Sequence, residues 1–442
     1  MRVGFIFPSS DYLYDPFRGD PHTHFQILTV IEQRFNGNAE LFLIDLIGVA
    51  RDSAKYHIQD CDVYLYSLYT LDFEELAGLV NMLRERFPEA VHVTGGPHAV
   101  LFQEQTLEVF DSLIIGEGEE IIINMLVDVA LRRDVKPRYV ETRRMDINAY
   151  PYPKRKWMAE TAVARKGLMK TKKNPEYGEL LSTTVMFSRD CPYSCAFCAI
   201  GQYSGGVRYR HPHLVEQEIN YLKRDYGIQG ISMLDEIVVP LSRDKAIPYL
   251  EAIGRTDIKW RGQTRVDMMT EELAALMRET GCVSMSLGVE SASQTCLDIV
   301  NKKIDVEQSK RTIKMLKEAG IECRVYMMSG MPGEPDDIVA RTLEFLWETQ
   351  PDVVTMSMFT VRPGTAIWQN PEKFGIKSVT TDWQNMMNLQ ARYEDEKPKL
   401  SFEYEEGKGF STERIVENFL EVQGKLKEWG MSSAIFAKEE VC

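Results

Sequence analysis

Short apolar runs alternate with amphipathic stretches along residues 1–135. The apolar runs have the length of buried strands and cover residues 3–7, 41–46, 63–67, 91–94 and 113–115. Between two of these runs, Leu76, Leu79, Val80 and Leu83 recur at the spacing of one helix face. Short strands separated by helices predict an α/β fold with a doubly wound, Rossmann-like parallel sheet. Ligands of such sheets bind beyond the carboxyl ends of the strands.

The pattern stops near residue 135 and resumes near residue 181. Residues 136–180 are rich in Lys, Arg and Pro, which predicts a linker. Residues 181–365 repeat the alternation six times, which predicts a partial (βα)6 TIM-like barrel, since a closed barrel has eight units. The strands are expected at 183–188, 230–237, 258–266, 283–289, 323–330 and 353–359, and helices at 213–226, 270–280, 306–319 and 335–349. Residues 366–442 are expected to form a short helical C-terminal cap, with Ser411 as the N-cap of a helix through Trp429.

Composition and charge limit the classes of partner. The 442 residues are 44% hydrophobic and 27% charged, as in globular proteins, and carry a net charge of −14. This acidic balance disfavours nucleic acid, which is bound by a surplus of Lys and Arg. No apolar run reaches the roughly 18 residues of a membrane span, and the N-terminus lacks the order of a signal peptide. We therefore expect a cytoplasmic protein that contacts no membrane.

Three of the eight cysteines lie close together, in the segment SRDCPYSCAFC. Cys191, Cys195 and Cys198 follow the first expected barrel strand, so they lie at the mouth where barrel enzymes carry out their chemistry. Three thiolates can hold three irons of a [4Fe–4S] cluster and leave the fourth iron open to a substrate. A zinc site with His211 or His213 as fourth ligand is the alternative, but the second pair of ligands usual in structural zinc sites is missing.

The cysteine spacing, with Phe197 before the last cysteine, resembles the radical SAM superfamily. The segments GVRYRHPHLVEQEI, ISMLDEIVV, RGQTRVD, SLGVESASQ, YMMSGMPGE and VRPGTAIW follow in order. Together with TGGPHAV and IIGEGEE in the first domain, they resemble radical SAM enzymes that carry an N-terminal cobalamin-binding domain. The resemblance covers about residues 1–365 and implies a [4Fe–4S] cluster and S-adenosylmethionine (SAM) as cofactors.

The resemblance also implies roles for residues at the barrel mouth. Asp235 and Glu236 would accept from the methionine amino group of SAM, Glu290 from the ribose hydroxyls, and Arg324 would pair with the methionine carboxylate. The full set of implied SAM-binding residues is Phe197, Asp235, Glu236, Arg265, Glu290, Arg324 and Gly330. Substrate binding by Asp235 and Glu236, an internal Arg–Glu ion pair, and a tight turn at Gly330 are the alternatives. Glu236 and Tyr203 are candidate acids for the reaction.

Arg208 and Arg210 precede an expected helix. They either orient the cofactor or substrate, or pair with Glu216 and Glu218.

The resemblance assigns Ser67, Gly95, Gly96, His98 and Gly116 to the binding of cobalamin. The segment Asp20-Pro21-His22-Thr23-His24-Phe25 matches the cobalt-ligating loop of relatives only in part, so His22 and His24 are expected to be loop residues. The short connection between the second and third strands, about residues 48–60, leaves a degenerate domain without cobalamin as the alternative.

Two reaction classes follow from these features. The first is cobalamin-dependent C-methylation of a small molecule, begun by a 5′-deoxyadenosyl radical that abstracts hydrogen. The second is dehydration, cyclisation or rearrangement without a methyl donor. Both need an external electron donor of the flavodoxin or ferredoxin type. An electron carrier is disfavoured, because a carrier does not need six barrel strands that end in polar groups.

Overall fold

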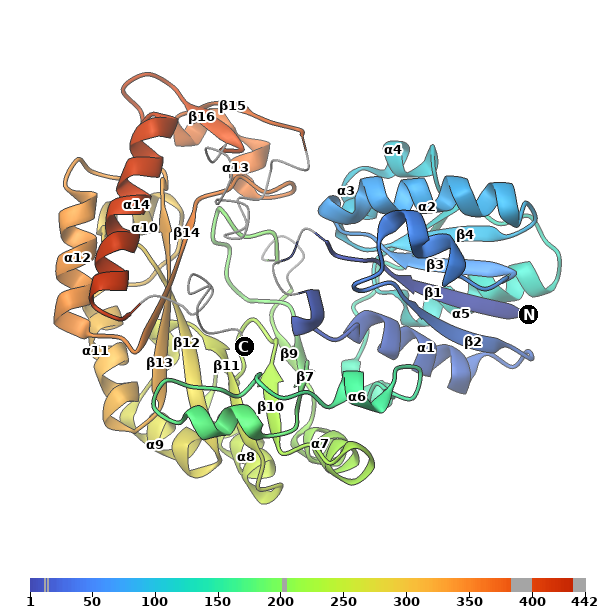
Figure 1. Cartoon of the computed structure of the whole chain (residues 1–442), viewed down its shortest axis with the longest axis horizontal. Coiled ribbons are helices and arrows are strands. Elements are labelled where there is room, and N and C mark those ends of the chain that lie inside the picture. Colours follow the sequence, from blue (N-terminus) through green and yellow to red (C-terminus); the bar gives the residue numbers. More distant parts are fainter. Residues whose placement is uncertain (12, 14–15, 201–204, 383–399, 432–442) are drawn as a thin grey trace. The chain divides into compact units, whose positions relative to one another are not determined.

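The computed structural model describes the chain except for residues 12, 14–15, 201–204, 383–399 and 432–442. It divides into two compact units, unit 1 (Met1–Val163) and unit 2 (Ala164–Cys442). Each unit contains a six-stranded parallel sheet with helices against it (Figure 1). The predicted α/β fold is therefore confirmed, while the predicted division into four segments stays a prediction.

Unit 1 is a doubly wound parallel sheet in the order β2-β1-β3-β4-β5-β6. Its strands are β1 (Arg2–Phe7), β2 (Glu40–Asp45), β3 (Val63–Ser67), β4 (Val91–Gly95), β5 (Ser112–Ile115) and β6 (Arg138–Val140). Its α-helices are α1 (His22–Arg34), α2 (Phe73–Arg86), α3 (Pro97–Leu101), α4 (Gln103–Leu107), α5 (Gly118–Ala130) and α6 (Glu160–Val163).

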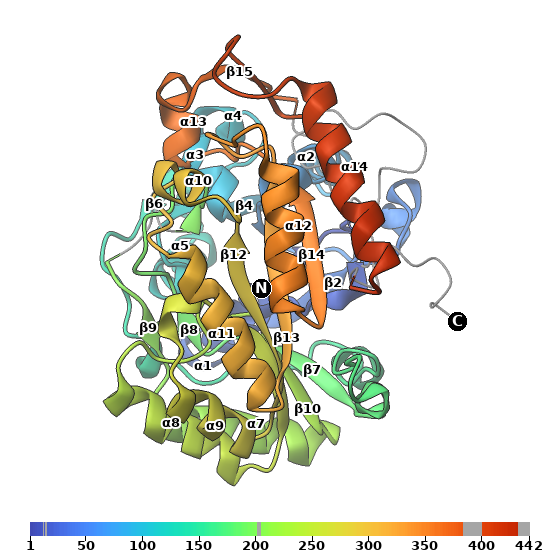
Figure 2. The same ribbon diagram turned by 90° about the vertical axis from the view of Figure 1, so that its left-hand side faces the viewer.

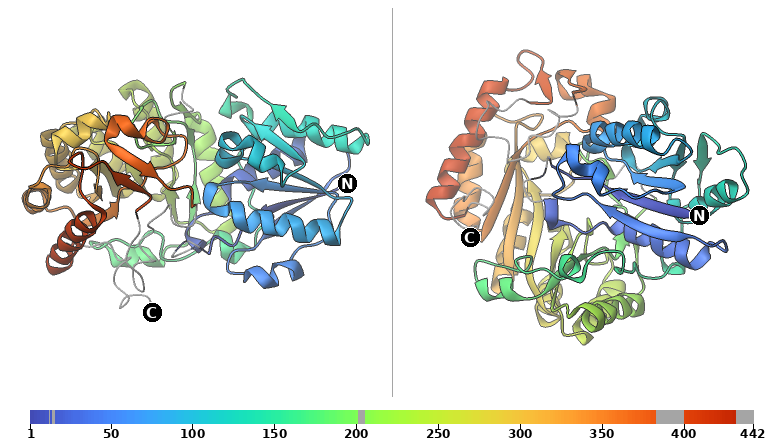
Figure 3. Two further views of the ribbon diagram at one scale, coloured as in Figure 1. Left: turned by 90° about the horizontal axis from the view of Figure 1, so that it is seen from above. Right: turned by 45° about the vertical axis from the view of Figure 1, so that its right-hand side comes forward.

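Alternate side chains of the central strands enter two separate cores, one on each face of the sheet. Phe5 and Leu65 pack with α1 and α5, whereas Ile6 and Tyr66 pack with α2. Because successive strand residues point to opposite faces, this alternation places helices on both faces (Figure 3). Between β2 and β3 the chain forms only a short 3-10 helix (Arg51–Tyr56), which agrees with the short connection in the sequence.

Unit 2 is an open, partial barrel in the order β14-β13-β12-β11-β10-β7, with all neighbours parallel. Its strands are β7 (Ser182–Val185), β10 (Gly230–Met233), β11 (Lys259–Thr264), β12 (Cys282–Glu290), β13 (Glu322–Ser329) and β14 (Val353–Met358). Its outer helices are α7 (Pro212–Tyr226), α8 (Arg243–Arg255), α9 (Glu271–Glu279), α10 (Gln294–Ile299), α11 (Val306–Glu318) and α12 (Ile338–Thr349). Figure 2 shows α11 and α12 along the outer face of the curved sheet.

Local sequence signals explain where these helices begin and end. Pro212 opens α7 with a fixed backbone angle, and Gly227 closes it in the left-handed region at φ 65°. The side chains of Thr270, Asp305 and Ser411 each accept a backbone N–H in the first turn of the helix that follows. The predicted N-cap at Ser411 is thus confirmed, and its helix is α14 (Thr412–Glu428).

The C-terminal segment is less helical than predicted. Besides α13 (Ala366–Gln369) and α14, its described part contains an antiparallel pair of strands, β15 (Ile376–Val379) and β16 (Phe402–Tyr404). Helix α14 packs against β14 and α12 on the side of the barrel.

Each edge strand of the open barrel has a partner outside the sheet. The backbone N–H of Val354 in β14 donates to the carbonyl of Met431 at 2.8 Å. At the other edge, Ser182 of β7 exchanges two backbone hydrogen bonds with Arg165. No helix among the described residues is long and apolar enough to cross a membrane.

Candidate active site

The three clustered cysteines lie on the loop that connects the short strands β8 (Ser188–Arg189) and β9 (Arg208–Tyr209). Cys195 is buried, while Cys191 and Cys198 are half-buried. Burial raises the pKa of Cys191 and of Cys195, and for Cys195 the nearby charges of Lys302 and Arg265 act in the opposite direction. None of the three forms a disulfide bond.

The segment after α10 fastens the cysteine loop to the barrel. The Ala196 N–H donates to the carbonyl of Val300 at 2.8 Å, and Asn301 Nδ2 donates to the carbonyl of Ser194 at 2.9 Å. Asn301 has a positive φ of 54°, which is uncommon for a residue with a side chain. Strained backbone of this kind persists only where the surroundings hold it, and it concentrates at functional sites.

A cavity of about 520 Å³ lies against the cysteines inside unit 2. It brings together three of the predicted SAM-binding side chains that carry charge, Glu236, Arg265 and Glu290, with Phe197 and the three thiols. The remaining wall is partly apolar, with Met327, Met328, Met358 and Phe359. The cavity therefore combines sulfur, carboxylate and guanidinium groups in a space large enough for a small molecule.

Glu290 ends β12 and forms an ion pair with Lys302 inside the cavity. The Lys302 Nζ lies 2.6 Å from Glu290 Oε1, and the two side chains are only 7% and 12% exposed. Lys302 Nζ also lies 5.7 Å from the ring centroid of Phe197. Glu290 is thus held in an internal ion pair with a lysine, while the Arg–Glu pair expected as the alternative occurs at Arg324 and Glu322.

Glu236 faces the same cavity from the end of β10. Desolvation raises its pKa, while the positive charges of Arg362 and Lys302 act in the opposite direction. Asp235, its neighbour, points elsewhere: it is buried and absent from the cavity wall. Its Oδ1 accepts the backbone N–H of Phe187 at 2.9 Å and the backbone N–H and hydroxyl of Ser188. Asp235 therefore fixes the strand that leads into the cysteine loop.

Arg324 and Gly330 do not line the cavity. Arg324 Nε lies 3.0 Å from Glu322 Oε1, near the beginning of β13. Gly330 has φ 88°, and a Cβ there would lie 2.7 Å from Ile415 of α14. Its carbonyl accepts the hydroxyl of Tyr404 at 2.9 Å. The lack of a side chain at Gly330 is therefore explained by packing of the C-terminal segment.

Two further barrel candidates are Tyr203 and Arg208. Tyr203 lies outside the described residues. Arg208 pairs with Asp190 at 2.7 Å rather than with Glu216, which pairs with Arg255.

Several cavity residues were not among the predicted ones. Besides the apolar residues named above, these are Tyr193, Ile237, Gln263, Thr264, Gly288, Lys302, Tyr326, Thr355, Ser357, Thr360 and Arg362. Tyr326, Thr355 and Ser357 could have been found from the period of two within β13 and β14, which puts alternate residues on the inner face. Lys302 carries no such signal, because it follows a helix in a stretch of ordinary polar residues.

The donor set fits an iron–sulfur cluster. A [4Fe–4S] cluster binds its thiolates through different irons, so the three sulfurs need not converge on one point. The described residues contain no group of three or more His, Cys, Asp or Glu side chains that could hold one metal ion. This finding gives no support to the single zinc ion considered from the sequence.

The cobalamin candidates of unit 1 share one edge of the sheet. Ser67, Gly95 and Gly96, and Gly116 end or follow β3, β4 and β5, respectively. A Cβ at Gly96 would lie 2.9 Å from the backbone of Leu68, and one at Gly116 would lie 2.0 Å from the carbonyl oxygen of Glu141. The space at these two glycines is thus taken by the chain itself.

Three histidines of unit 1 are likewise engaged by the fold. The buried ring of His98 contacts the rings of Phe73 and Phe102. His22 and His24 lie in the first turn of α1, and not in a loop as predicted. His24 Nε2 lies 2.9 Å from the carbonyl oxygen of Ile6, and burial lowers the pKa of His24 to about 4. The positions of these side chains therefore give no evidence for cobalamin binding.

Residues 185–346, which contain the cysteine loop and most of the cavity wall, match the sequence profile of the radical SAM superfamily. This part of the chain is a radical SAM domain. The anaerobic magnesium-protoporphyrin IX monomethyl ester cyclase of Cereibacter sphaeroides is 31% identical over 311 residues, which are 66% of this chain and 50% of the cyclase. An uncharacterized methyltransferase of Pyrococcus horikoshii is 30% identical over 63% of this chain and 62% of its own length.

A solved structure extends the likeness beyond the radical SAM domain. The radical SAM methyltransferase TsrM from Kitasatospora setae, with cobalamin and a [4Fe–4S] cluster bound, aligns with a TM-score of 0.70 at 17% identity. The alignment covers 95% of this chain and 90% of TsrM, and it shows a shared fold. The chain spans about half the length of the cyclases that it matches.

Proposed function

We propose that the protein is a radical SAM enzyme that removes a hydrogen atom from a small-molecule substrate. One observation carries the proposal: three thiols, two carboxylates and three cationic side chains line a single cavity of unit 2, most of whose wall belongs to the radical SAM domain. A [4Fe–4S] cluster bound there would supply the electron that cleaves SAM to methionine and a 5′-deoxyadenosyl radical. Cys191, Cys195 and Cys198 are the proposed ligands of the cluster.

The side chains of the cavity suit the polar parts of SAM. Glu236 lines the cavity as an exposed residue and offers carboxylate oxygens to an ammonium group. Glu290 is held by Lys302, which leaves its second oxygen to accept a hydroxyl. Met327, Met328, Met358 and Phe359 offer apolar surface to the rest of a bound ligand.

Carbon methylation is the reaction that we propose first. The uncharacterized methyltransferase and TsrM support this choice, and the structure of TsrM contains cobalamin. A bound methylcobalamin would supply the methyl group. The alternative is a reaction without a methyl donor, such as cyclisation, which is supported by the 31% identity to a cyclase.

The test is product analysis of anaerobically reconstituted protein. The protein is first scanned for the absorbance of bound corrinoid and then incubated with SAM and dithionite. Bound corrinoid, S-adenosylhomocysteine and 5′-deoxyadenosine together would support methylation. 5′-Deoxyadenosine alone would support the alternative, and the absence of both products would overturn the proposal.

A matched pair of variants controls for the loss of any buried thiol. Cys195→Ala should lose iron, sulfide and 5′-deoxyadenosine formation. Cys282→Ala removes another buried cysteine of unit 2, whose thiol donates to the carbonyl of Ser284 at 3.8 Å, and it should retain all three. Equal iron content in the two variants would contradict the assignment.

A radical SAM enzyme needs a reductant, and we propose an electron donor of the flavodoxin or ferredoxin type. Titration of the enzyme with reduced flavodoxin in place of dithionite tests the donor type.

A cytoplasmic location stays a prediction from the sequence.

A further inference from the structure

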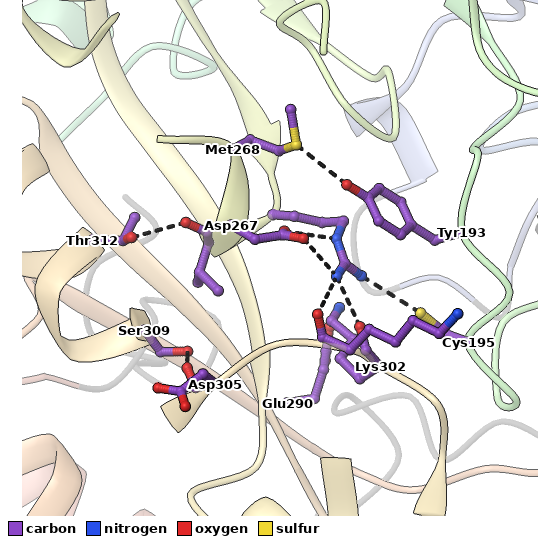
Figure 4. A network of polar contacts seen from close by, with 12 residues as sticks. Tyr193, Cys195, Asp267, Met268, Glu290, Lys302, Asp305, Ser309 and Thr312 are labelled. Atoms are coloured by element: carbon purple, nitrogen blue, oxygen red, sulfur yellow. Dashed lines mark hydrogen bonds and ion pairs between the residues drawn. The ribbon is translucent and has the colours of Figure 1, made fainter. Parts of the chain in front are cut away.

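Arg265 is enclosed by protein groups next to the cysteine loop. It follows β11, and its side chain is only 6% exposed. Its guanidinium carbon lies 3.6 Å from the ring centroid of Tyr193, which covers one face of the group. Its Nη1 lies 3.7 Å from Cys195 Sγ, within the range of a hydrogen bond to sulfur. Figure 4 shows the contacts around Cys195, Asp267 and Tyr193.

Most of the guanidinium donors are occupied by the protein itself. Nε donates to Asp267 Oδ1 at 2.8 Å, and Nη2 donates to Asp267 Oδ2 at 3.1 Å. Nη2 also donates to the carbonyl of Lys302 at 2.8 Å and approaches that of Lys303 at 3.3 Å. A guanidinium has five N–H groups, so after the contact with Cys195 at most one is left for a cofactor. This is a poor arrangement for a residue whose task is to bind SAM.

We propose that Arg265 is a positioning residue that sets the reduction potential of the cluster through its contact with Cys195. The inference rests on the proposed function, because it requires Cys195 to hold the cluster. It differs from the SAM-binding role that the family resemblance implied for Arg265.

The physical reason is the charge of the cluster. Reduction adds one electron, and a cation or an N–H donor at a ligand sulfur stabilises the more negative state. The effect is strong at a buried site, where water screens charge poorly. Asp267 neutralises part of the charge of Arg265. Removing either charge should therefore shift the reduction potential of the cluster, in opposite directions for the two residues. Loss of the cation should make reduction harder, and loss of the anion should make it easier.

Arg265 also ties the cysteine loop to the 302–303 segment, so a purely structural role must be separated from an electrostatic one. A structural role would change the amount of cluster that the protein retains. It would not move the potential of the retained cluster in opposite directions when the two partners are changed in turn.

The experiment is an EPR-monitored redox titration of the reconstituted holoenzyme, without SAM and then with SAM. Arg265→Gln is compared with Arg265→Lys and Asp267→Asn. The matched control is Arg243→Gln, which breaks the exposed ion pair with Glu272 on the outside of the barrel. Iron and sulfide per chain are measured in every sample.

In Arg265→Gln the ratio of reduced to oxidised cluster at a fixed potential should fall about tenfold without SAM, which equals about 59 mV for one electron. Arg265→Lys should recover part of this shift, and Asp267→Asn should shift the potential in the positive direction. Arg243→Gln should leave it unchanged.

Unchanged potentials in both Arg265→Gln and Asp267→Asn, or shifts of the same sign, would overturn the inference. If Arg265→Gln loses its cluster, Asp267→Asn alone tests the inference. A positive shift of its potential supports the inference, and an unchanged or negative shift overturns it. A shift that appears only with SAM would assign Arg265 to cofactor binding and would also overturn it. Failure of the proposed function itself is distinct, because the unaltered protein would then bind no cluster or would not cleave SAM.

Discussion

Lys302 Nζ lies 2.6 Å from Glu290 Oε1, and both side chains are almost fully enclosed by the barrel. Glu290 is also one of the few residues with a side chain and a positive φ, at 68°. The lysine comes from the turn after α10 and the glutamate from the end of β12. The pair therefore connects the sheet to the segment after α10, which holds the cysteine loop.

Removing one partner of this pair should leave a buried charge. Lys302→Met is expected to destabilise the protein by about 3 kcal/mol, because Glu290 would be desolvated without compensation. Lys302→Met combined with Glu290→Gln should recover much of that loss. Urea unfolding of the cluster-free protein measures both, and a double variant no more stable than Lys302→Met would contradict the coupling.

Asp235 and Glu236 are neighbours with different expected roles. Asp235→Ala should reduce stability by about 2 kcal/mol, because the donors of Phe187 and Ser188 would lose their buried acceptor. Glu236→Ala should leave stability within about 0.5 kcal/mol and weaken SAM binding about tenfold or more. Equilibrium binding of SAM and urea unfolding separate the two effects. Weaker binding in both variants with unchanged stability would contradict this division.

Glu334 should make the stability of unit 2 depend on pH. Burial raises its pKa to about 7, although its carboxylate accepts the backbone N–H groups of Met331 and Gly330. Since the folded pKa exceeds the unfolded value of 4.5, this contribution to stability is complete below about pH 4.5 and is lost as pH rises through 7.

Glu334→Gln removes this titration and keeps an acceptor oxygen. The loss of stability between pH 5 and pH 8 should therefore be smaller in the variant, by on the order of 1–3 kcal/mol. Glu344→Gln, at an exposed position of α12, is the control and should follow the unaltered protein. Identical pH profiles for all three proteins would contradict the prediction.

Gly116→Ala should disrupt unit 1. Its Cβ would lie 2.0 Å from the carbonyl oxygen of Glu141, which requires β5 and β6 to separate. Gly167→Ala has a similar positive φ of 94° in open space, so it carries the backbone strain without the clash. Hydrogen exchange should become faster in β5 and β6 for Gly116→Ala, and only near the mutation for Gly167→Ala. A well-protected Gly116→Ala variant that has lost only corrinoid binding would favour a ligand role instead.

The period of hydrophobic residues predicts most of the fold, because long strands and amphipathic helices repeat it over many positions. Strand β6 was missed, since three residues with one buried side chain, Tyr139, carry no period. It lies in the segment predicted as a linker. The two-stranded sheet of β15 and β16 was missed for the same reason.

For the candidate site, the sequence indicates which residues reach the barrel mouth but not which way they point. Asp235 and Glu236 are adjacent in sequence, yet only Glu236 enters the cavity. Arg324 was predicted to reach inward, but it has a nearer partner in Glu322. Such outcomes depend on competing contacts from distant segments, which local pattern does not encode.

The hydrogen bonds of Val354 with Met431 and of Ser182 with Arg165 have a consequence for self-association. A barrel that does not close presents two strands whose outer amides can recruit another chain. Here a short backbone segment at Arg165, before the barrel, covers part of the edge of β7. A second segment, at Met431 after the barrel, covers part of the edge of β14. A shortened protein lacking either piece would expose more strand-edge amides and should be more prone to associate edge to edge.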